Sequence, residues 1–377
     1  MEGGVVRIAE SSREIPVLGE YDVVVVGGGL SGMAASVTVA RRGLKTALFC
    51  ERGYLGWEIV GTFTCAFDKT DKAISPLLKG EIVERLEAVG GYKKERFDVN
   101  ALQIILDEIV RDAGVEVYFS TRPCGVLAEG DEVKGVIVVN KSGRQAALGR
   151  LIIDASDQAR VAALAGAEFQ KLDPLITVKR SFVVNNAALE TPIIVRMPPE
   201  FDLSDDRVYI QPTVWGGELV VTFYLTGECD PTDPEEVTRV EFESRRKVFE
   251  IMSYLKGNVP GFENAMLTHT DFEPLFLNGV RIAGQETVNF EEAITKHDVP
   301  PGIACSVTYM EELNEETAVF YIPYGCLIPR GLKNLLVCSS HISVDQIIQS
   351  FLLQFSNALQ LGEGTGKFIT SILMREG

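Results

Sequence analysis

Apolar residues near the start of the chain gather in short, continuous runs. Residues 21–26 (YDVVVV) form a valine-rich run, which indicates a strand buried on both faces, as in a parallel sheet. It leads into the glycine-rich segment 27–32 (GGGLSG), a helix of small residues that ends near Gly43, and a second strand over 44–49. Strand, turn, helix and strand fill the length that one βαβ unit needs.

The next hundred residues continue this alternation of predicted helices and strands. Residues 81–90 and 98–113 predict helices. The apolar residues of the second segment form one stripe, and Asp98 is a suitable N-cap at its start. A strand is expected over 115–119. Three further stretches between 125 and 153, separated by polar turns, predict a β-meander that ends in a buried strand.

The pattern changes after residue 175. Alternating apolar positions within 179–226 indicate antiparallel strands with one wet face, and a helix is expected over 234–256. Buried-strand patterning returns from 321, and a C-terminal helical stretch interrupted by the glycines of 362–366 follows.

These patterns predict an α/β fold with two domains. The first is a Rossmann-type dinucleotide-binding domain over 20–175 and 318–377, with a parallel central sheet and a β-meander. An α+β domain with a mainly antiparallel sheet is inserted over 176–317, and residues 1–19 are an N-terminal extension.

Composition narrows the function classes. The net charge of −17 opposes binding to nucleic acid, and no apolar run approaches the length of a membrane span. The seven cysteines are scattered without a C-x-x-C pair, which favours a reducing cytoplasm over a secreted disulfide framework. No His, Asp or Glu spacing suggests a metal site.

The glycine-rich segment has a mechanical interpretation. Gly27 permits the tight turn, Gly29 lets a pyrophosphate approach the backbone, and Gly32 allows close helix-on-strand packing. The helix that starts at Leu30 and Ser31 then directs free N–H groups at the phosphate. Glu51, at the end of the second strand, is placed to accept hydrogen bonds from ribose hydroxyls and would repel the 2′-phosphate of NADP. The loop alone leaves FAD and NAD both open.

Several segments together resemble a known family. Residues 21–29, Glu51-Arg52 with Leu55-Gly56, 133–136, 152–155, 260–264, 321–324 and 334–337 resemble the FAD-dependent oxidoreductases with a glutathione-reductase-type flavin domain, in the branch related to fumarate-reductase flavoproteins. The resemblance implies FAD as the cofactor. Residues 338–343 and the helix after Phe351 are then expected near the flavin ring. The expected cofactor-binding residues are Gly27, Gly29, Leu30, Ser31, Gly32, Glu51, Arg52, Gly56, Trp57, Cys124, Ser156 and Ser340.

The sequence departs from the family at the presumed cleft. Ala155-Ser156-Asp157 stands where the family tends to have Ala-Thr-Gly. Gly325, Ser340 and Leu353 stand where arginines would be expected. The smaller number of cations in the presumed cleft leaves two alternatives open. One is a variant active site, and the other is a flavin subunit without chemistry of its own.

Two residues are candidates for catalysis. His341 follows a buried strand and precedes the C-terminal helix, so it is either an acid/base or substrate-orienting group or a structural histidine. Arg281 either binds a carboxylate or carbonyl oxygen of a substrate or forms an ordinary ion pair. A third candidate pair, His297 with Asp298, is expected to be a solvated loop.

We therefore expect a cytoplasmic FAD-dependent oxidoreductase that transfers a hydride between a small organic substrate and the flavin. The alternatives are a flavin-carrying electron-transfer subunit of a larger complex and a flavin-binding protein that has lost catalytic groups. The expected partners are a small-molecule substrate and, in addition, a second copy of the chain or an electron-transfer protein.

Overall fold

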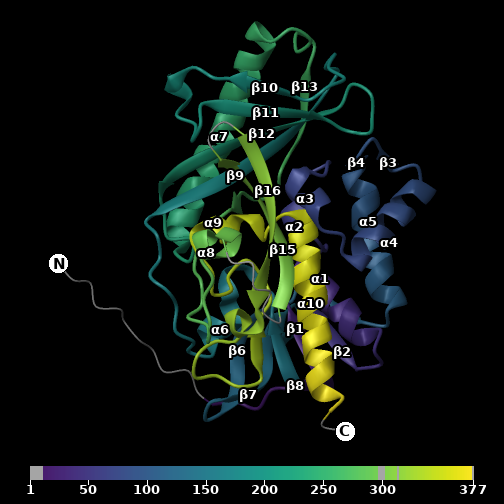
Figure 1. Ribbon diagram of the computed structural model, residues 1–377, viewed down its shortest axis with the longest axis vertical. Helices are drawn as coiled ribbons and strands as arrows, with labels where there is room; N and C mark the ends of the chain where they lie inside the picture. Colours follow the sequence, from purple (N-terminus) through teal and green to yellow (C-terminus); the bar gives the residue numbers. More distant parts are fainter. Residues whose placement is uncertain (1–11, 296–301, 312–313, 376–377) are drawn as a thin grey trace, which may run out of the picture.

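The computed structural model describes residues 12–295, 302–311 and 314–375. Two bodies lie one above the other, and the upper one consists of the inserted sheet with its long helix (Figure 1). The fold is the mixed α/β architecture predicted from the sequence, with a parallel central sheet in one body and an antiparallel sheet in the other.

The central sheet has the strand order β5-β2-β1-β8-β7-β6, with β17 also pairing with β8. Strands β5 (Glu116–Tyr118), β2 (Thr46–Phe49), β1 (Val17–Val26), β8 (Gly143–Asp154) and β17 (Leu335–Val337) are parallel neighbours. Strands β7 (Glu132–Asn140) and β6 (Arg122–Glu129) continue the sheet antiparallel to β8. Strand β8 therefore belongs to both parts of the sheet: its first half pairs with β7 of the meander, and residues 146–154 pair with β1.

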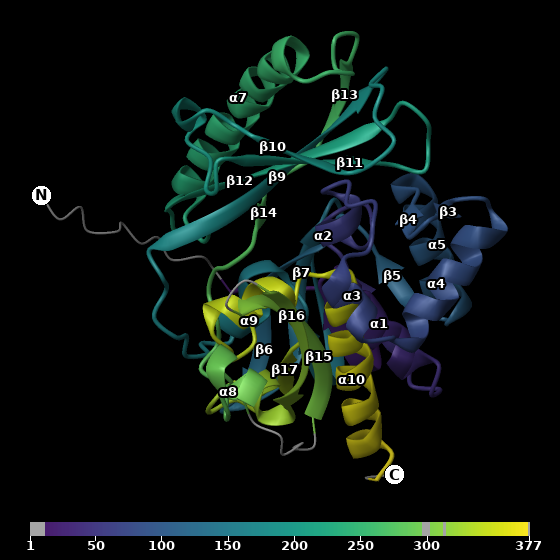
Figure 2. The same ribbon diagram turned by 45° about the horizontal axis from the view of Figure 1, so that its top comes forward.

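Helices cover this sheet. Helix α1 (Leu30–Ala40) packs against α10 (Phe355–Leu373), while α4 (Leu77–Ala88) and α5 (Val99–Asp112) lie side by side beyond α1 (Figures 1 and 2). The shorter helices are α2 (Trp57–Val60), α3 (Lys69–Ala73), α6 (Arg160–Leu164), α8 (Phe290–Thr295) and α9 (Gln346–Phe351), and β3 (Tyr92–Lys93) with β4 (Arg96–Phe97) forms a small ribbon.

The predicted interruption of the C-terminal helix is wrong, because α10 runs unbroken through its glycines. A methyl group on Gly362 would lie 2.2 Å from the Ser31 carbonyl oxygen, and one on Gly366 would lie 2.7 Å from Thr38 Cβ. These glycines let α10 lie directly against α1, so they serve close helix packing and do not end the helix.

The inserted body is an antiparallel sheet with one long helix across it. Its strand order is β10-β11-β12-β9-β13, and β14 also pairs with β9. Helix α7 (Pro234–Asn258) covers one face of this sheet (Figure 2) and begins at the predicted N-cap Asp233. The strands are β9 (Leu175–Asn185), β10 (Ile193–Arg196), β11 (Arg207–Pro212), β12 (Leu219–Glu228), β13 (Met266–Thr270) and β14 (Leu275–Phe276).

A β-hairpin departs from the expected domain limits. Strands β15 (Gly302–Glu311) and β16 (Asn314–Pro323) pair only with each other among the described strands, and Ile303, Cys305 and Phe320 join the core of the first body. The predicted limit at residue 318 would cut this hairpin in two. Near the N-terminus, β1 begins at Val17, inside the predicted extension over 1–19, and Val17 pairs with Ala146 of β8. We propose that the inserted body ends near residue 278.

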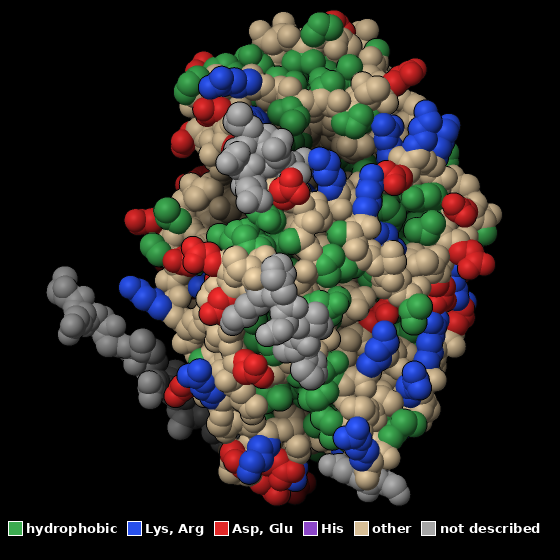
Figure 3. All heavy atoms as spheres, viewed as in Figure 1, with side chains coloured by type: hydrophobic (Ala, Val, Ile, Leu, Met, Phe, Trp, Pro, Cys, Tyr) green, Lys and Arg blue, Asp and Glu red, His purple; other side chains and the backbone are tan. Residues whose placement is uncertain are grey.

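Among the described residues, no helix combines the length and apolar character needed to cross a membrane. On the face shown in Figure 3, lysine and arginine side chains are scattered among acidic ones.

Candidate functional site

The turn from β1 into α1 is fixed by two glycines. A methyl group on Gly27, whose φ is 117°, would lie 2.0 Å from the Ala155 carbonyl oxygen. One on Gly32 would lie 2.0 Å from the carbonyl oxygen of Gly27 itself. No side chain fits at either position, so the backbone requires glycine there. The turn places the N-terminus of α1 at the carboxyl edge of the parallel strands, where open α/β sheets bind ligands.

The start of α1 is held from two sides. Ser31 donates a hydrogen bond from Oγ to the Cys338 carbonyl oxygen over 2.7 Å, which ties the helix to the end of β17. The backbone N–H of Leu30 donates to Glu58 Oε1 over 2.6 Å. The N-cap, Gly29, has no side chain to satisfy these N–H groups, so Glu58 from α2 acts as a cap supplied by another element.

Glu58 is buried, with 4% of its surface exposed. A methyl group on Gly29 would lie 3.0 Å from Glu58 Oε2 and 3.1 Å from Oε1, so the carboxylate rests against the glycine loop. Oε2 has no hydrogen-bond partner. Burial raises the pKa of Glu58 to about 7, although the N–H groups of Glu58 itself and Leu30 act in the opposite direction.

The segment after β2 carries four of the predicted residues. Glu51 is 45% exposed at its side chain and forms an ion pair with Arg122 over 3.2 Å. Arg52 stacks on Trp57, with its guanidinium carbon 4.3 Å from the ring centroid, and pairs with Glu273 of the inserted body, 2.7 Å from Nη2 to Oε2. Gly56, at φ 65°, begins α2.

The predicted serines line the same small cavity, and the predicted cysteine does not. Ser156 donates from Oγ to Asp154 Oδ1 over 2.5 Å and accepts from the N–H of Arg160 over 2.8 Å. Ser340 is buried and, with Ser156, lines a small cavity beside Glu58. Cys124, on β6, is a partly exposed free thiol and is not among the residues that line this cavity.

His341 also lines this cavity. Its Nδ1 lies 2.8 Å from the Val280 carbonyl oxygen, and because a carbonyl can only accept, Nδ1 carries a proton. Nε2 then faces Asp157 Oδ1 at 3.4 Å. Burial opposes ionisation of Asp157, but hydrogen bonding with His341 and its charge outweigh burial and lower the pKa of that carboxyl.

Arg281 meets His341 through a shared neighbour, Gln349. Arg281 Nη1 donates to Gln349 Oε1 over 3.2 Å, and Gln349 Nε2 donates over 3.2 Å to the Val280 carbonyl oxygen, the same oxygen that accepts from His341 Nδ1. The guanidinium also lies 3.4 Å from Asp173. Arg281 is buried and is not among the residues that line the cavity. His341 and Arg281 are thus brought together, but only His341 faces the cavity.

The cavity itself is small. Its volume is about 20 Å³, which is room for about one water molecule, whereas pockets for cofactors measure roughly 300–1,000 Å³. Trp57 and Glu58 lie directly against Gly29. The backbone turn fits a dinucleotide, but in this conformation the side chains of Trp57 and Glu58 do not fit a pyrophosphate at the same place.

A second cavity, of about 270 Å³, lies at the junction of the two bodies. Its lining is rich in aromatic side chains and includes Phe63, Phe97, Trp215, His269 and Phe272. Phe272 also donates its N–H to the Gly61 carbonyl oxygen over 3.4 Å, so this cavity adjoins the segment that carries Trp57 and Glu58.

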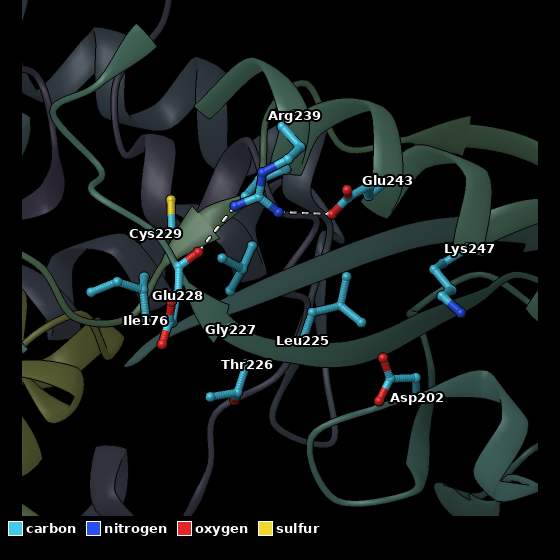
Figure 4. Close-up of a pocket in the computed structure, with 12 residues that line it drawn as sticks. Ile176, Asp202, Leu225, Thr226, Gly227, Glu228, Cys229, Arg239, Glu243 and Lys247 are labelled. Carbon is cyan, nitrogen blue, oxygen red and sulfur yellow. Dashed lines mark hydrogen bonds and ion pairs between the residues drawn. The ribbon is translucent and has the colours of Figure 1, made fainter. Parts of the chain in front are cut away.

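A third cavity, of about 420 Å³, lies within the inserted body between α7 and the ends of β9 and β12 (Figure 4). Arg239 donates to Glu243 Oε2 over 3.2 Å and to the Glu228 carbonyl oxygen over 3.0 Å. None of the residues predicted from the sequence lines this cavity, and its arginine is paired within it, so we assign it no role.

The described part of the chain contains no group of three His, Cys, Asp or Glu side chains that could hold a metal ion.

The glycine turn, the parallel sheet and the inserted antiparallel sheet define a dinucleotide-binding protein of the Rossmann type. The chain belongs to the family of FAD dependent oxidoreductases, which matches it over residues 22–174 and 173–369. FAD is the cofactor to which this family and the flavoprotein neighbours of the fold point.

Two curated relatives match parts of the chain. The tRNA uridine 5-carboxymethylaminomethyl modification enzyme MnmG of Aquifex aeolicus is 36% identical over 87 residues, which are 23% of this chain and 13% of that enzyme. Digeranylgeranylglycerophospholipid reductase of Sulfolobus acidocaldarius is 31% identical over 140 residues, 32% of this chain and 30% of the reductase. The chain thus spans less than a third of the length of either relative.

Solved structures share the fold over nearly the whole chain. A geranylgeranyl bacteriochlorophyll reductase-like protein from Thermoplasma acidophilum has a TM-score of 0.60 at 14% identity, covering 95% of this chain and 79% of that one. The p-nitrophenol 4-monooxygenase PnpA from Pseudomonas putida has a TM-score of 0.57 at 12% identity, covering 97% and 82%. At these identities the likeness concerns the fold.

Proposed function

We propose that the chain is an FAD-dependent oxidoreductase that transfers a hydride between a small organic substrate and the flavin, with a flavin domain of the glutathione-reductase type. The observation that carries the proposal is the β1–α1 turn, where Gly27 and Gly32 admit no side chain and the helix N-terminus faces the sheet edge. FAD, when bound, supplies the hydride acceptor or donor. The family match supports this choice. The comparisons give no support to an electron-transfer subunit or a protein without catalytic groups.

The residues predicted from the sequence divide between the two ends of the cofactor site. Glu51 follows β2 and is partly exposed, as a residue that receives a ribose must be. We assign Cys124 to the same end, because it lies two residues from Arg122, the partner of Glu51. Ser156 and Ser340 lie at the other end, beside His341.

The junction cavity is our candidate for the substrate site. Its aromatic walls suit a small molecule with an apolar or aromatic part, since aromatic side chains contribute large apolar contact area. Lys179 lies near this junction, where its Nζ donates to Thr64 Oγ1 over 2.7 Å. Burial lowers the pKa of Lys179 to about 8, so this amine changes its charge close to neutral pH.

We assign His341 and Asp157 the handling of a proton. His341 presents Nε2 to Asp157 and to the small cavity, and its ring is fixed by the Val280 carbonyl. Arg281 is a positioning residue, because it holds Gln349, which donates to the Val280 carbonyl oxygen that fixes the His341 ring. Full turnover by His341→Ala with the true substrate would remove His341 from this role.

The setting of the reaction is also part of the proposal. We place the protein in the cytoplasm, acting on a small molecule without nucleic acid or membrane, either as a homo-oligomer or with an electron-transfer protein. The scattered positive charge on the face in Figure 3 agrees with the absence of a nucleic-acid partner.

The test begins with the visible absorption spectrum of the purified protein and identification of any chromophore released by acid. Released FAD, followed by turnover with an artificial electron acceptor, is the expected result. A folded protein that neither carries flavin nor takes up added FAD, even when Glu58 is substituted, would overturn the proposed function.

A further inference from the structure

The start of α1 is already occupied by an anion from the chain itself. Glu58 Oε1 accepts from the Leu30 N–H over 2.6 Å, and both carboxylate oxygens lie close to Gly29. In a dinucleotide-binding loop, this is where a pyrophosphate accepts N–H groups at the positive end of the helix dipole. The carboxylate and a pyrophosphate cannot occupy the same place.

The Glu58 carboxylate is incompletely satisfied where it lies. Its surface is 4% exposed and Oε2 has no hydrogen-bond partner. A buried carboxylate oxygen without a partner costs free energy. The caps Asp98 and Asp233 also use one oxygen, but they are at the surface, where water can satisfy the other. The second oxygen of Glu58 is buried against Gly29, where a better anion could replace it.

The segment that carries Glu58 is held in place by the inserted body. Arg52 stacks on Trp57 and pairs with Glu273, from the connection between β13 and β14. Phe272, its neighbour, donates its N–H to Gly61 and packs its ring 5.6 Å from Tyr54. Residues 52–61 are therefore fastened at both ends by two consecutive residues of the other body.

We infer that Glu58 is an internal anion that closes the dinucleotide site, and that FAD binds by displacing Glu58 and Trp57 from the glycine loop. The inference rests on the proposed function, because it takes FAD as the ligand. With Glu58 and Trp57 against Gly29, the cavity beside them has about 20 Å³, so these side chains must move before a dinucleotide can enter. Opening requires the contacts of Arg52 with Glu273 to loosen, so the inserted body controls access to the cofactor.

The experiment measures the dissociation constant of FAD by quenching of its fluorescence, for the wild type and for Glu58→Gln, Glu58→Ala and Glu273→Gln. The two Glu58 variants are expected to bind FAD at least ten times more tightly, because the competing charge is gone. Glu273→Gln should shift the constant the same way, because it releases Arg52 without touching the glycine loop. Glu87→Gln, on the exposed side of α4, is the charge-matched control and should bind as the wild type does.

The outcomes separate this inference from the proposed function. Equal or weaker FAD binding by folded Glu58 variants, beside a wild type that binds FAD, would overturn the inference and leave the function standing. If no variant and no wild type bound FAD, both would fall. Circular dichroism verifies that each variant is folded, and Glu273→Gln tests the inference independently if the Glu58 variants do not fold.

Discussion

Arg180 and Asp271 lie in contact where neither side chain is exposed to solvent, with Arg180 Nε 2.7 Å from Asp271 Oδ1. The two atoms lack the alignment of a hydrogen bond, so the contact is one of charge. Arg180 also donates to Glu241 over 2.8 Å, and Asp271 accepts from the Ser181 N–H over 2.7 Å. Burial raises the pKa of Asp271 to about 7 even though Arg180 opposes this. The pair joins β9 to the connection that also carries Phe272 and Glu273.

Arg180→Met should lower the free energy of unfolding by about 3–5 kcal/mol, because it leaves a buried carboxylate without its cation. Denaturation in urea measures the loss. Arg245→Met is the matched control, since Arg245 pairs with the same Glu241 but is 51% exposed at its side chain; its loss should be at most about 1 kcal/mol. Equal losses for the two variants would show that burial of the pair does not matter.

Gly362→Ala should destabilise the protein by about 1–3 kcal/mol or more, because its methyl group would collide with the Ser31 carbonyl and push α10 off α1. Gly80→Ala in α4 is the control, since a methyl group there meets nothing within 4 Å. That substitution should stabilise by about 0.5–1 kcal/mol. Thermal unfolding compares the two, and a neutral Gly362→Ala would contradict the packing role.

Glu58→Gln should change how stability depends on pH. The folded pKa of about 7 lies above the ordinary 4.5, so between these values the folded protein binds more protons than the unfolded one. Stability of the wild type should therefore fall, relative to Glu58→Gln, as the pH rises from about 4.5 to about 7, by about 3 kcal/mol in total. Urea denaturation at several pH values, with Glu87→Gln alongside, measures this; a constant difference would mean that Glu58 titrates normally.

The junction cavity can be examined through its tryptophan. The chain has two, Trp57 and Trp215, so Trp57→Phe leaves Trp215 as the reporter. An aromatic probe such as 4-nitrophenol should quench the fluorescence of Trp215 saturably, because the bound probe and the Trp215 ring would lie in the same cavity. Val220→Phe, which fills the cavity, should abolish saturation. Quenching that rises linearly with probe concentration, with and without Val220→Phe, would show that the cavity does not bind the probe.

Local signals were enough to predict much of the fold. The valine run, the glycine turn and the caps Asp98 and Asp233 each act within a few residues, so their interpretation needs no distant partner. The structure places β1, α1, α5 and α7 accordingly. The glycines of α10 misled the prediction, because a glycine that permits close packing and a glycine that ends a helix are the same residue in a sequence.

The site depends on contacts that the sequence does not pair. Glu58 meets Leu30 because α2 folds back over the start of α1. Asp157 was noted from the sequence only as a departure from its family, and its proximity to His341 arises from two distant segments. The one available signal for Glu58 was a large aromatic residue followed by an acid, Trp57-Glu58, directly after Gly56.

The hydrogen bond from Ser31 to Cys338 joins residues 307 positions apart. A ribosome that adds about 5–20 residues per second therefore finishes the glycine turn roughly 15–60 s before it makes the strand that supports it. During that interval the nascent chain has the phosphate-binding sequence without its support from β17 and α10. Cofactor binding therefore has to wait until β17 and α10 have been made, and loss of α10 would leave the glycine loop without the helix that packs against it.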